Sequence, residues 1–222
     1  LNKSRQEGFQ KQFPGATVTT KAGGSAKGIQ DLLAGQVDIA AVSRDLTAQE
    51  QDQGLIAVPI ALDAIAIVVG NDNPFRRGLT TDQVSGIFQG QIADWSAVGG
   101  SSGPIRVVNR PEGSGTQKAF LELVLKGGSF GTGANFTTLA RDATTPMLQA
   151  LKGNGIGYAT YAQVANQRTV RTVAIDGLTP ESQVYPFKRK LFYVYKNPPS
   201  EAVQAFLGFV TSPQGQQLLN VP

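Results

Sequence analysis

Two apolar segments, AIAIVV at 64–69 and KLFYVYK at 190–196, constrain the fold of this chain more than any other feature. Both read as strands, and the first is apolar on both faces, as central strands of parallel sheets are. The block between them has its own alternation of helix and strand signals. A chain that leaves one domain, builds a second and returns must cross twice. We therefore predict two α/β lobes joined by two hinge strands, with lobe 1 at 1–68 plus 190–222 and lobe 2 at 69–189. Small ligands usually bind between domains, so we expect the ligand cleft between the lobes.

Within both lobes, helix and strand signals alternate as in α/β folds. Glycine and proline mark the ends of the elements, and Thr47 with Glu50 has the spacing of a helix capping box. Helices are predicted at 1–13, 26–34, 48 onward, 80–88, 115–126, 145 onward and 201–210. Strands are predicted at 16–21, 37–42, 55–60, 64–69, 104–109, 155–161, 169–175 and 190–196.

The residue composition excludes several classes of chemistry. The sequence has no cysteine and no histidine, which excludes disulfides, thiolate nucleophiles, serine–histidine pairs and ordinary zinc sites. We therefore expect neither a metal nor a cofactor. The net charge of +4 favours acidic partners. The sequence lacks the dense basic run with stacking aromatics that is typical of nucleic-acid-binding proteins. No apolar run approaches the about 20 residues of a membrane span. The polar N-terminus is not a signal peptide, so we expect any export leader to have been removed already.

The segment RPEGSGTQKAF, which begins at Arg110, combines an arginine with glycines and hydroxyls before a predicted helix. Gly113 and Gly115 lack side chains, so a ligand can approach the backbone closely. The first N–H groups of a helix have no internal partner, and the helix dipole adds positive charge there. Ser114 and Thr116 add hydroxyl donors, and the arginine can bind two oxygens of a tetraoxyanion. The motif predicts an anion site, and phosphate fits it.

Glu112 belongs to the same motif but would repel an anion if it pointed inward. Since it lies two residues from Arg110, we expect it to pair with the guanidinium and fix its orientation. The alternative interpretation of the whole segment is a helix capped by Ser114 beside a surface Arg–Glu pair.

Two further segments have features that suit an anion site. Gly24 and Ser25 come just before a predicted helix, and Ser43 and Arg44 follow the strand at 37–42. Alone, the first pair is an ordinary helix cap and Arg44 an exposed loop residue. Like Arg110, however, each pair lies after a strand and before a helix, where ligands gather in α/β sheets. We therefore take all three places as one predicted anion site.

The motif and its surroundings closely resemble the phosphate-binding proteins of ABC phosphate uptake systems. The resemblance rests on RPEGSGT, with LTTDQVSGIFQGQIADWSAVGG before it and GNGIGYATYAQV after it. The tail YPFKRKLFYVYKNPPSEAVQAFLGFVTSPQGQQLL also fits, so nearly the whole chain is covered in order. The resemblance implies a type II periplasmic-binding-protein fold, a periplasmic or extracytoplasmic location, inorganic phosphate as ligand, an ABC permease as partner, and a monomer.

Carried over by position, the resemblance assigns roles to individual residues. It implies that Arg110 salt-bridges the acid at position 112. The phosphate ligands that it implies are Ser25, Arg110, Ser114, Gly115 and Thr116. Ser43 and Arg44 join this set from their place after the strand, with Gly24 and Gly113 as supporting glycines.

The sequence departs from the family in two ways. The family begins with a strand and a small-residue loop carrying Ser/Thr ligands; these 222 residues lack that segment, and we expect the natural protein to have it. Many family members also place an aspartate where this chain has Ser43, to accept the proton of HPO₄²⁻ and repel sulfate. The departure keeps other oxyanions, such as sulfate or molybdate, as an alternative. A sensor or storage protein of the same fold is a second alternative. A hydrolase with Ser114 as nucleophile is a third, although no histidine could activate it.

Overall fold

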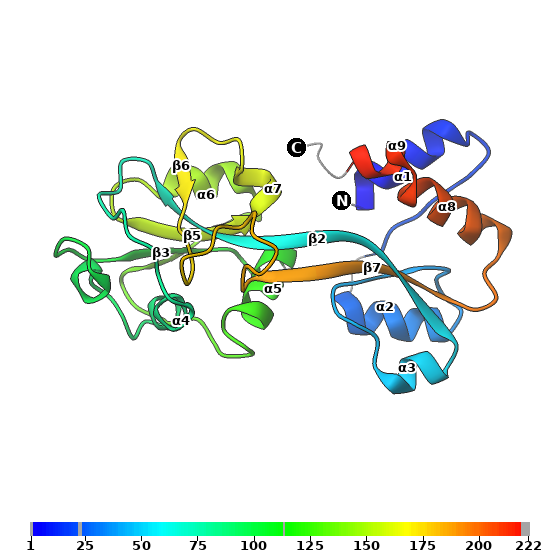
Figure 1. Cartoon of the computed structure of the whole chain (residues 1–222), viewed down its shortest axis with the longest axis horizontal. Coiled ribbons are helices and arrows are strands. Elements are labelled where there is room, and N and C mark those ends of the chain that lie inside the picture. Colours follow the sequence, from blue (N-terminus) through cyan, green and yellow to red (C-terminus); the bar gives the residue numbers. More distant parts are fainter. Residues whose placement is uncertain (1, 22–23, 113, 219–222) are drawn as a thin grey trace. The chain divides into compact units, whose positions relative to one another are not determined.

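The computed structural model describes residues 2–21, 24–112 and 114–218. The chain forms two compact units: unit 1 comprises residues 1–62 and 189–222, and unit 2 comprises residues 63–188. Figure 1 shows the elements of each unit. The chain passes between the units twice, inside strand β2 (Leu55–Gly70) and inside strand β7 (Lys188–Lys196). Among the described residues, no helix is both long and apolar enough to cross a membrane.

Unit 1 packs helices on both sides of a short sheet. Strand β1 pairs antiparallel with β7, and β7 lies next to β2. Ile29 and Leu32 fill the core on one side, whereas Phe9, Phe206 and Val210 fill the core on the other. The remaining elements of this unit are α1 (Asn2–Gln12), α2 (Gly24–Leu33), β1 (Ala40–Val42), α3 (Ala48–Asp52), α8 (Glu201–Thr211) and α9 (Pro213–Gln217).

Helix α2 lies close against β1. A Cβ placed on Gly28 would come within 3.3 Å of the Ala40 Cβ, so a glycine at this position permits the close approach. The approach places the start of α2 beside the residues that follow β1. Local packing in unit 1 thus brings two of the predicted site segments together.

The predicted strand at 16–21 is wrong, and the strand predicted at 37–42 covers only Ala40–Val42. Ala16 and Val18 do pack against the core, so the alternation of apolar residues correctly indicates which side chains face inward. A strand also needs a hydrogen-bonded neighbour, because unpaired backbone groups gain nothing from an extended conformation. Alternation alone does not reveal whether such a neighbour is present.

Unit 2 is built on a mixed sheet. Strand β3 (Arg106–Asn109) lies parallel to both β4 (Phe136–Thr138) and β5 (Gly155–Thr160). β2 is antiparallel to β5 and to β6 (Val170–Thr172). The helices are α4 (Thr81–Phe88), the 3₁₀ helix η1 (Trp95–Val98), α5 (Gly115–Leu123), α6 (Thr144–Ala150) and α7 (Tyr161–Val164).

Strand β2 corrects two predictions. The segments predicted as separate strands at 55–60 and 64–69 form one strand, which continues without a break through residues 61–63. Residues 64–70 are buried throughout, as expected for a central strand, but the predicted parallel pairing is wrong. A strand is buried on both faces wherever other elements cover both sides of its sheet, whether its neighbours are parallel or antiparallel.

An aromatic cluster positions α5 on the sheet of unit 2. Phe120 of α5 stacks on Tyr158 of β5 with ring centroids 4.1 Å apart, and Phe88 and Phe130 pack around the pair. The contact fixes the helix whose first residues directly follow β3 and the RPEGSGT segment.

Candidate functional site

Ser114 caps helix α5. Its Oγ accepts a hydrogen bond from the Gln117 N–H at 3.2 Å, and the residue is only 1% exposed. The Ser114 hydroxyl keeps its own proton available for donation. The N–H groups of Gly115 and Thr116 lie in the first turn, where a helix provides no internal acceptor. The start of α5 therefore presents a group of donors suited to an anion.

The Arg110 guanidinium is buried and held by two partners. Nη1 lies 2.7 Å from the Asp142 Oδ1, and Nη2 donates to the Thr144 Oγ1 at 3.3 Å. The predicted pair with Glu112 is therefore corrected: the carboxylate on Arg110 is Asp142, whereas Glu112 is exposed. Arg110 itself is 2% exposed, so its charge needs the counter-charge that Asp142 supplies.

The Arg110 backbone is fixed as well. Its N–H donates to the Asn109 Oδ1 at 2.8 Å, and its carbonyl accepts from the Gln117 Nε2 at 2.6 Å. The Tyr158 hydroxyl donates to the Asn109 Oδ1 at 2.6 Å and thereby orients that amide. Burial raises the pKa of Tyr158 well above its usual value, so the hydroxyl remains a donor. The arginine is thus anchored at both its backbone and its side chain.

Gly115 leaves open space at the start of α5. Apart from its chain neighbours and the backbone of its own helix, a Cβ built on it meets no heavy atom within 4 Å, and the residue is exposed. Nothing in the described protein requires glycine at this position for packing. The missing side chain leaves room for a ligand to approach the first N–H groups of the helix. Gly113, predicted to support the same site, lies outside the described residues.

Ser25 and Ser43 are in direct contact in unit 1. Their Oγ atoms lie 3.2 Å apart, and the Ser43 N–H donates to the Ser25 Oγ at 3.1 Å. Ser25 lies in the first turn of α2, after Gly24, and Ser43 directly follows β1. Two residues predicted separately from sequence therefore form one polar group in the structure.

Arg44 has a partner of its own. Its Nη1 and Nη2 donate to the two Glu50 carboxylate oxygens at 2.8 and 2.7 Å, and 41% of its side chain is exposed. Glu50 also completes the predicted capping box with Thr47, which is confirmed. The hydrogen bond from Arg44 lowers the pKa of Glu50 to about 2. The structure thus gives Arg44 an ion pair at the surface of unit 1.

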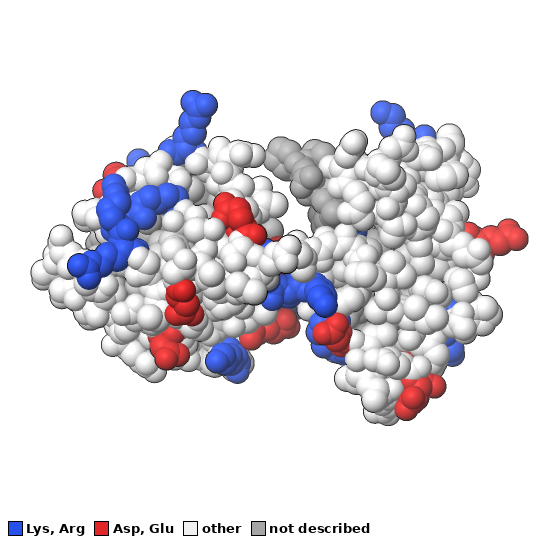
Figure 2. All heavy atoms as spheres, in the orientation of Figure 1, with Lys and Arg blue, Asp and Glu red and all other residues white. Residues whose placement is uncertain are grey.

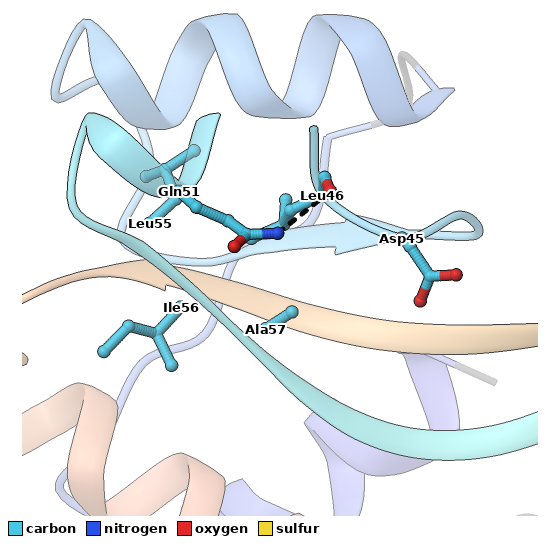
Figure 3. Close-up of a pocket in the computed structure, with 6 residues that line it drawn as sticks. All are labelled: Asp45, Leu46, Gln51, Leu55, Ile56 and Ala57. Carbon is cyan, nitrogen blue, oxygen red and sulfur yellow. Dashed lines mark hydrogen bonds between the residues drawn. The ribbon is translucent and has the colours of Figure 1, made fainter. Parts of the chain in front are cut away.

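A shallow pocket of about 360 Å³ lies in the same unit. In Figure 3 its walls come from the segment after β1, from α3 and from β2, with the Gln51 amide bonded to the Leu46 carbonyl. The lining residues are Asp45, Leu46, Gln51, Leu55, Ile56 and Ala57. They include no cation, and a carboxylate on the wall repels anions. The pocket therefore does not suit a phosphate ion.

Basic side chains gather on the part of unit 2 that carries β3 and β6 (Figure 2). In this unit Arg76 and Arg171 both donate to the carbonyls of Asn73 and Phe75. Burial and the nearby Arg76 lower the pKa of Arg171. These arginines satisfy the backbone of a turn, so their first role is to stabilise the end of β2.

Sequence reasoning missed the residues that hold Arg110 in place. Asn109 directly precedes the motif, and its position at the end of a predicted strand could have identified it as a candidate site residue. Asp142 and Thr144 lie more than 30 residues beyond the arginine, and no local signal links them to it.

Among the described residues, no group of three or more acidic side chains could hold a metal ion.

Comparison with known proteins extends this picture to the whole chain. The PBP superfamily domain matches residues 2–214. The phosphate-binding protein PstS of Pseudomonas aeruginosa is 30% identical, and the alignment covers 96% of this chain and 75% of the relative. The PstS of Bacillus subtilis is 29% identical; 80% of this chain aligns with it, and the match spans 58% of its length.

Solved structures agree with the sequence relatives. An ABC-type phosphate transport receptor from Vibrio cholerae superposes with a TM-score of 0.84 at 27% identity, over 98% of this chain and 91% of the receptor. A structure from Clostridium perfringens, described as a phosphate ABC transporter substrate-binding protein with bound phosphate, gives a TM-score of 0.73 at 31% identity, over 97% and 90%. The chain therefore belongs to the PBP superfamily, within its family of phosphate-binding proteins.

Proposed function

We propose that this protein is an extracytoplasmic solute-binding protein that captures inorganic phosphate and delivers it to an ABC permease. One observation carries the proposal: a buried, anchored Arg110 adjoins a helix start whose hydroxyl and N–H groups are free to donate. The names of the relatives support the choice of phosphate and of the transport system. The protein acts as a monomer, and phosphate leaves it unchanged.

The donor set suits a dianion that must also be released. An unpaired buried charge is very costly, so a bound phosphate needs many charge-assisted hydrogen bonds. Neutral hydroxyl and N–H donors at Ser114, Gly115 and Thr116 supply these bonds. Asp142 offsets the charge of Arg110, so the site does not hold phosphate by an excess of positive charge.

Unit 1 holds the other residues that the sequence predicted as oxyanion ligands. Ser25 and Ser43 offer two hydroxyls in contact. Many members of the family have, at the position of Ser43, a carboxylate that would repel sulfate. Its replacement by serine favours a second candidate, a receptor for another tetrahedral oxyanion.

Calorimetry of the full chain with phosphate, sulfate and molybdate tests both candidates. We expect one phosphate per chain and much weaker binding of the other two anions. Tighter binding of sulfate or molybdate would establish the second candidate instead. If none of the three binds, the proposed function is wrong.

Replacing Gly115 with alanine separates ligand access from stability. The new methyl group meets no heavy atom within 4 Å apart from its chain neighbours and the backbone of its own helix, and alanine is the better helix former, so the free energy of unfolding should stay equal or rise by up to about 1 kcal/mol. Phosphate affinity should fall roughly tenfold, because a hydrogen bond to a charged group contributes about 1.5–3 kcal/mol. Calorimetry and chemical denaturation measure the two effects.

The matched control is Gly208→Ala in α8, where an added Cβ also meets nothing within 4 Å. It should show the same change in stability with unchanged phosphate affinity. Equal affinities of the Gly115→Ala variant and the wild type would remove the start of α5 from the site.

Arg44→Ala tests the weakest member of the proposed site. Because Glu50 already binds both Nη atoms and the side chain is partly exposed, we expect phosphate affinity to fall by less than about fivefold. Exposed ion pairs contribute about 0.2–1 kcal/mol, which sets this limit. An unchanged affinity by calorimetry would remove Arg44 from the site, and a loss equal to that of Arg110→Ala would show direct contact with phosphate.

A further inference from the structure

The Arg110 guanidinium is oriented by groups outside its own loop. Asp142, just before α6, holds Nη1, and Thr144, the first residue of α6, holds Nη2. Nε of the same guanidinium is buried and has no hydrogen-bond acceptor among the described residues. A planar guanidinium held at both Nη atoms cannot rotate, so the direction of its Nε–H is fixed as well.

Thr144 extends this contact to another helix. Its hydroxyl accepts from Arg110 and donates to the Gln163 Oε1 at 3.0 Å, so both functions of the hydroxyl are used. Gln163 belongs to α7, which directly follows β5. Through this chain of bonds, two helices of unit 2 determine where the arginine points.

The two acidic residues near Arg110, Asp142 and Glu112, differ in their contact with its guanidinium. The side chain of Asp142 is 42% exposed while its partner is 3% exposed, so the carboxylate reaches a buried cation from the solvent side. Glu112 lies on the same loop as Arg110 and is exposed. Only the first of these carboxylates is placed to compensate the buried charge and to restrain the guanidinium plane.

We propose that Asp142, supported by Thr144 and Gln163, is the positioning residue that aims the Nε edge of Arg110 at phosphate. The inference rests on the proposed function and gives the role predicted for Glu112 to a residue 30 positions further along the chain. A bound oxyanion satisfies the buried Nε–H, for which an unmade hydrogen bond is unfavourable. Pre-orientation by Asp142 removes the need to order the arginine when phosphate arrives.

Phosphate titrations of matched variants test the proposal. Asp142→Asn keeps the shape of the side chain and removes its charge; affinity should fall about 10- to 100-fold, by analogy with the loss of groups that orient metal-binding side chains. Asp142→Glu should restore part of the affinity. Glu112→Gln, and Asp82→Asn at the exposed start of α4, remove the same charge and should stay within about twofold of the wild type. If Glu112→Gln weakens binding as much as Asp142→Asn does, the proposal is overturned.

A spectroscopic readout separates orientation from general stability. The ¹⁵N–¹H resonance of the Arg110 Nε, assigned by its loss in Arg110→Lys, should be sharp without phosphate in the wild type and in Glu112→Gln. In Asp142→Asn it should broaden, because the guanidinium is released. Adding phosphate to the wild type should shift it, because the Nε–H gains an acceptor. A resonance that stays sharp in Asp142→Asn, with phosphate affinity unchanged, would rule out the positioning role.

The same comparison keeps the two proposals distinguishable. If the wild type binds no phosphate, the proposed function fails, and the resonances recorded without phosphate still decide whether Asp142 orients Arg110. If the wild type binds phosphate and the Asp142→Asn variant binds it equally well, only the positioning role fails.

Discussion

Arg110→Ala is expected to reduce phosphate affinity by roughly 30-fold or more. Truncating one member of a buried charge pair costs about 2–5 kcal/mol, and each 1.4 kcal/mol is a factor of ten in affinity. The loss has two parts: phosphate loses the arginine proposed to bind it, and Asp142 keeps a negative charge without its Arg110 partner. Calorimetric titration with phosphate measures the sum.

The double variant Arg110→Ala/Asp142→Asn separates these parts. Removing the carboxylate charge should recover some affinity if repulsion between Asp142 and phosphate contributes to the loss. Arg171→Ala is a control for loss of a part-buried arginine elsewhere in unit 2, where its guanidinium donates to backbone carbonyls. An Arg110→Ala variant with wild-type affinity would remove the central residue of the proposed site, and with it the proposed function.

Local chemistry made part of this site predictable. A glycine-flanked Ser114 at the start of a helix has one preferred role as a cap, and the structure shows that role. The same is true of the capping box at Thr47 and Glu50. In each case the residues that interact are within four positions of one another, so the sequence contains both partners of the contact.

Contacts between distant segments were not predictable. The partner of Arg110 could be sought only among nearby acids, which suggested Glu112, whereas the fold brings Asp142 beside it from the segment before α6. The direction of β2 and the absence of a strand at 16–21 have the same cause. Pairing depends on which segments become neighbours, and a single sequence shows only the periodicity of each segment.

Arg5 presents the opposite situation, a charged residue at a position that periodicity assigns to the core. It lies in α1 one turn before Phe9 and is fully buried. Its guanidinium carbon lies 5.4 Å from the centroid of the Tyr193 ring, and Nη2 donates to the Ile60 carbonyl at 3.2 Å. Nε and Nη1 have no acceptor among the described residues.

The favourable contacts of Arg5 contribute about 0.5–2 kcal/mol for the ring and about 1.5–3 kcal/mol for the hydrogen bond. Burial of an uncompensated charge costs several kcal/mol, and each unsatisfied donor about 1–3 kcal/mol more.

Because the costs exceed the gains, Arg5→Met should stabilise the protein. Methionine fills a similar elongated space without a charge, and replacing buried ionic groups by apolar ones often stabilises by about 1–4 kcal/mol. For a chain of this size each kcal/mol raises Tm by roughly 2–4 °C. Differential scanning calorimetry without phosphate should show the increase, whereas Arg5→Ala should lower Tm through the cavity it leaves. The exposed Arg168→Met is the control for loss of a surface arginine and should leave Tm nearly unchanged. A lower Tm for Arg5→Met would mean that the contacts with Tyr193 and Ile60 outweigh the burial of the charge.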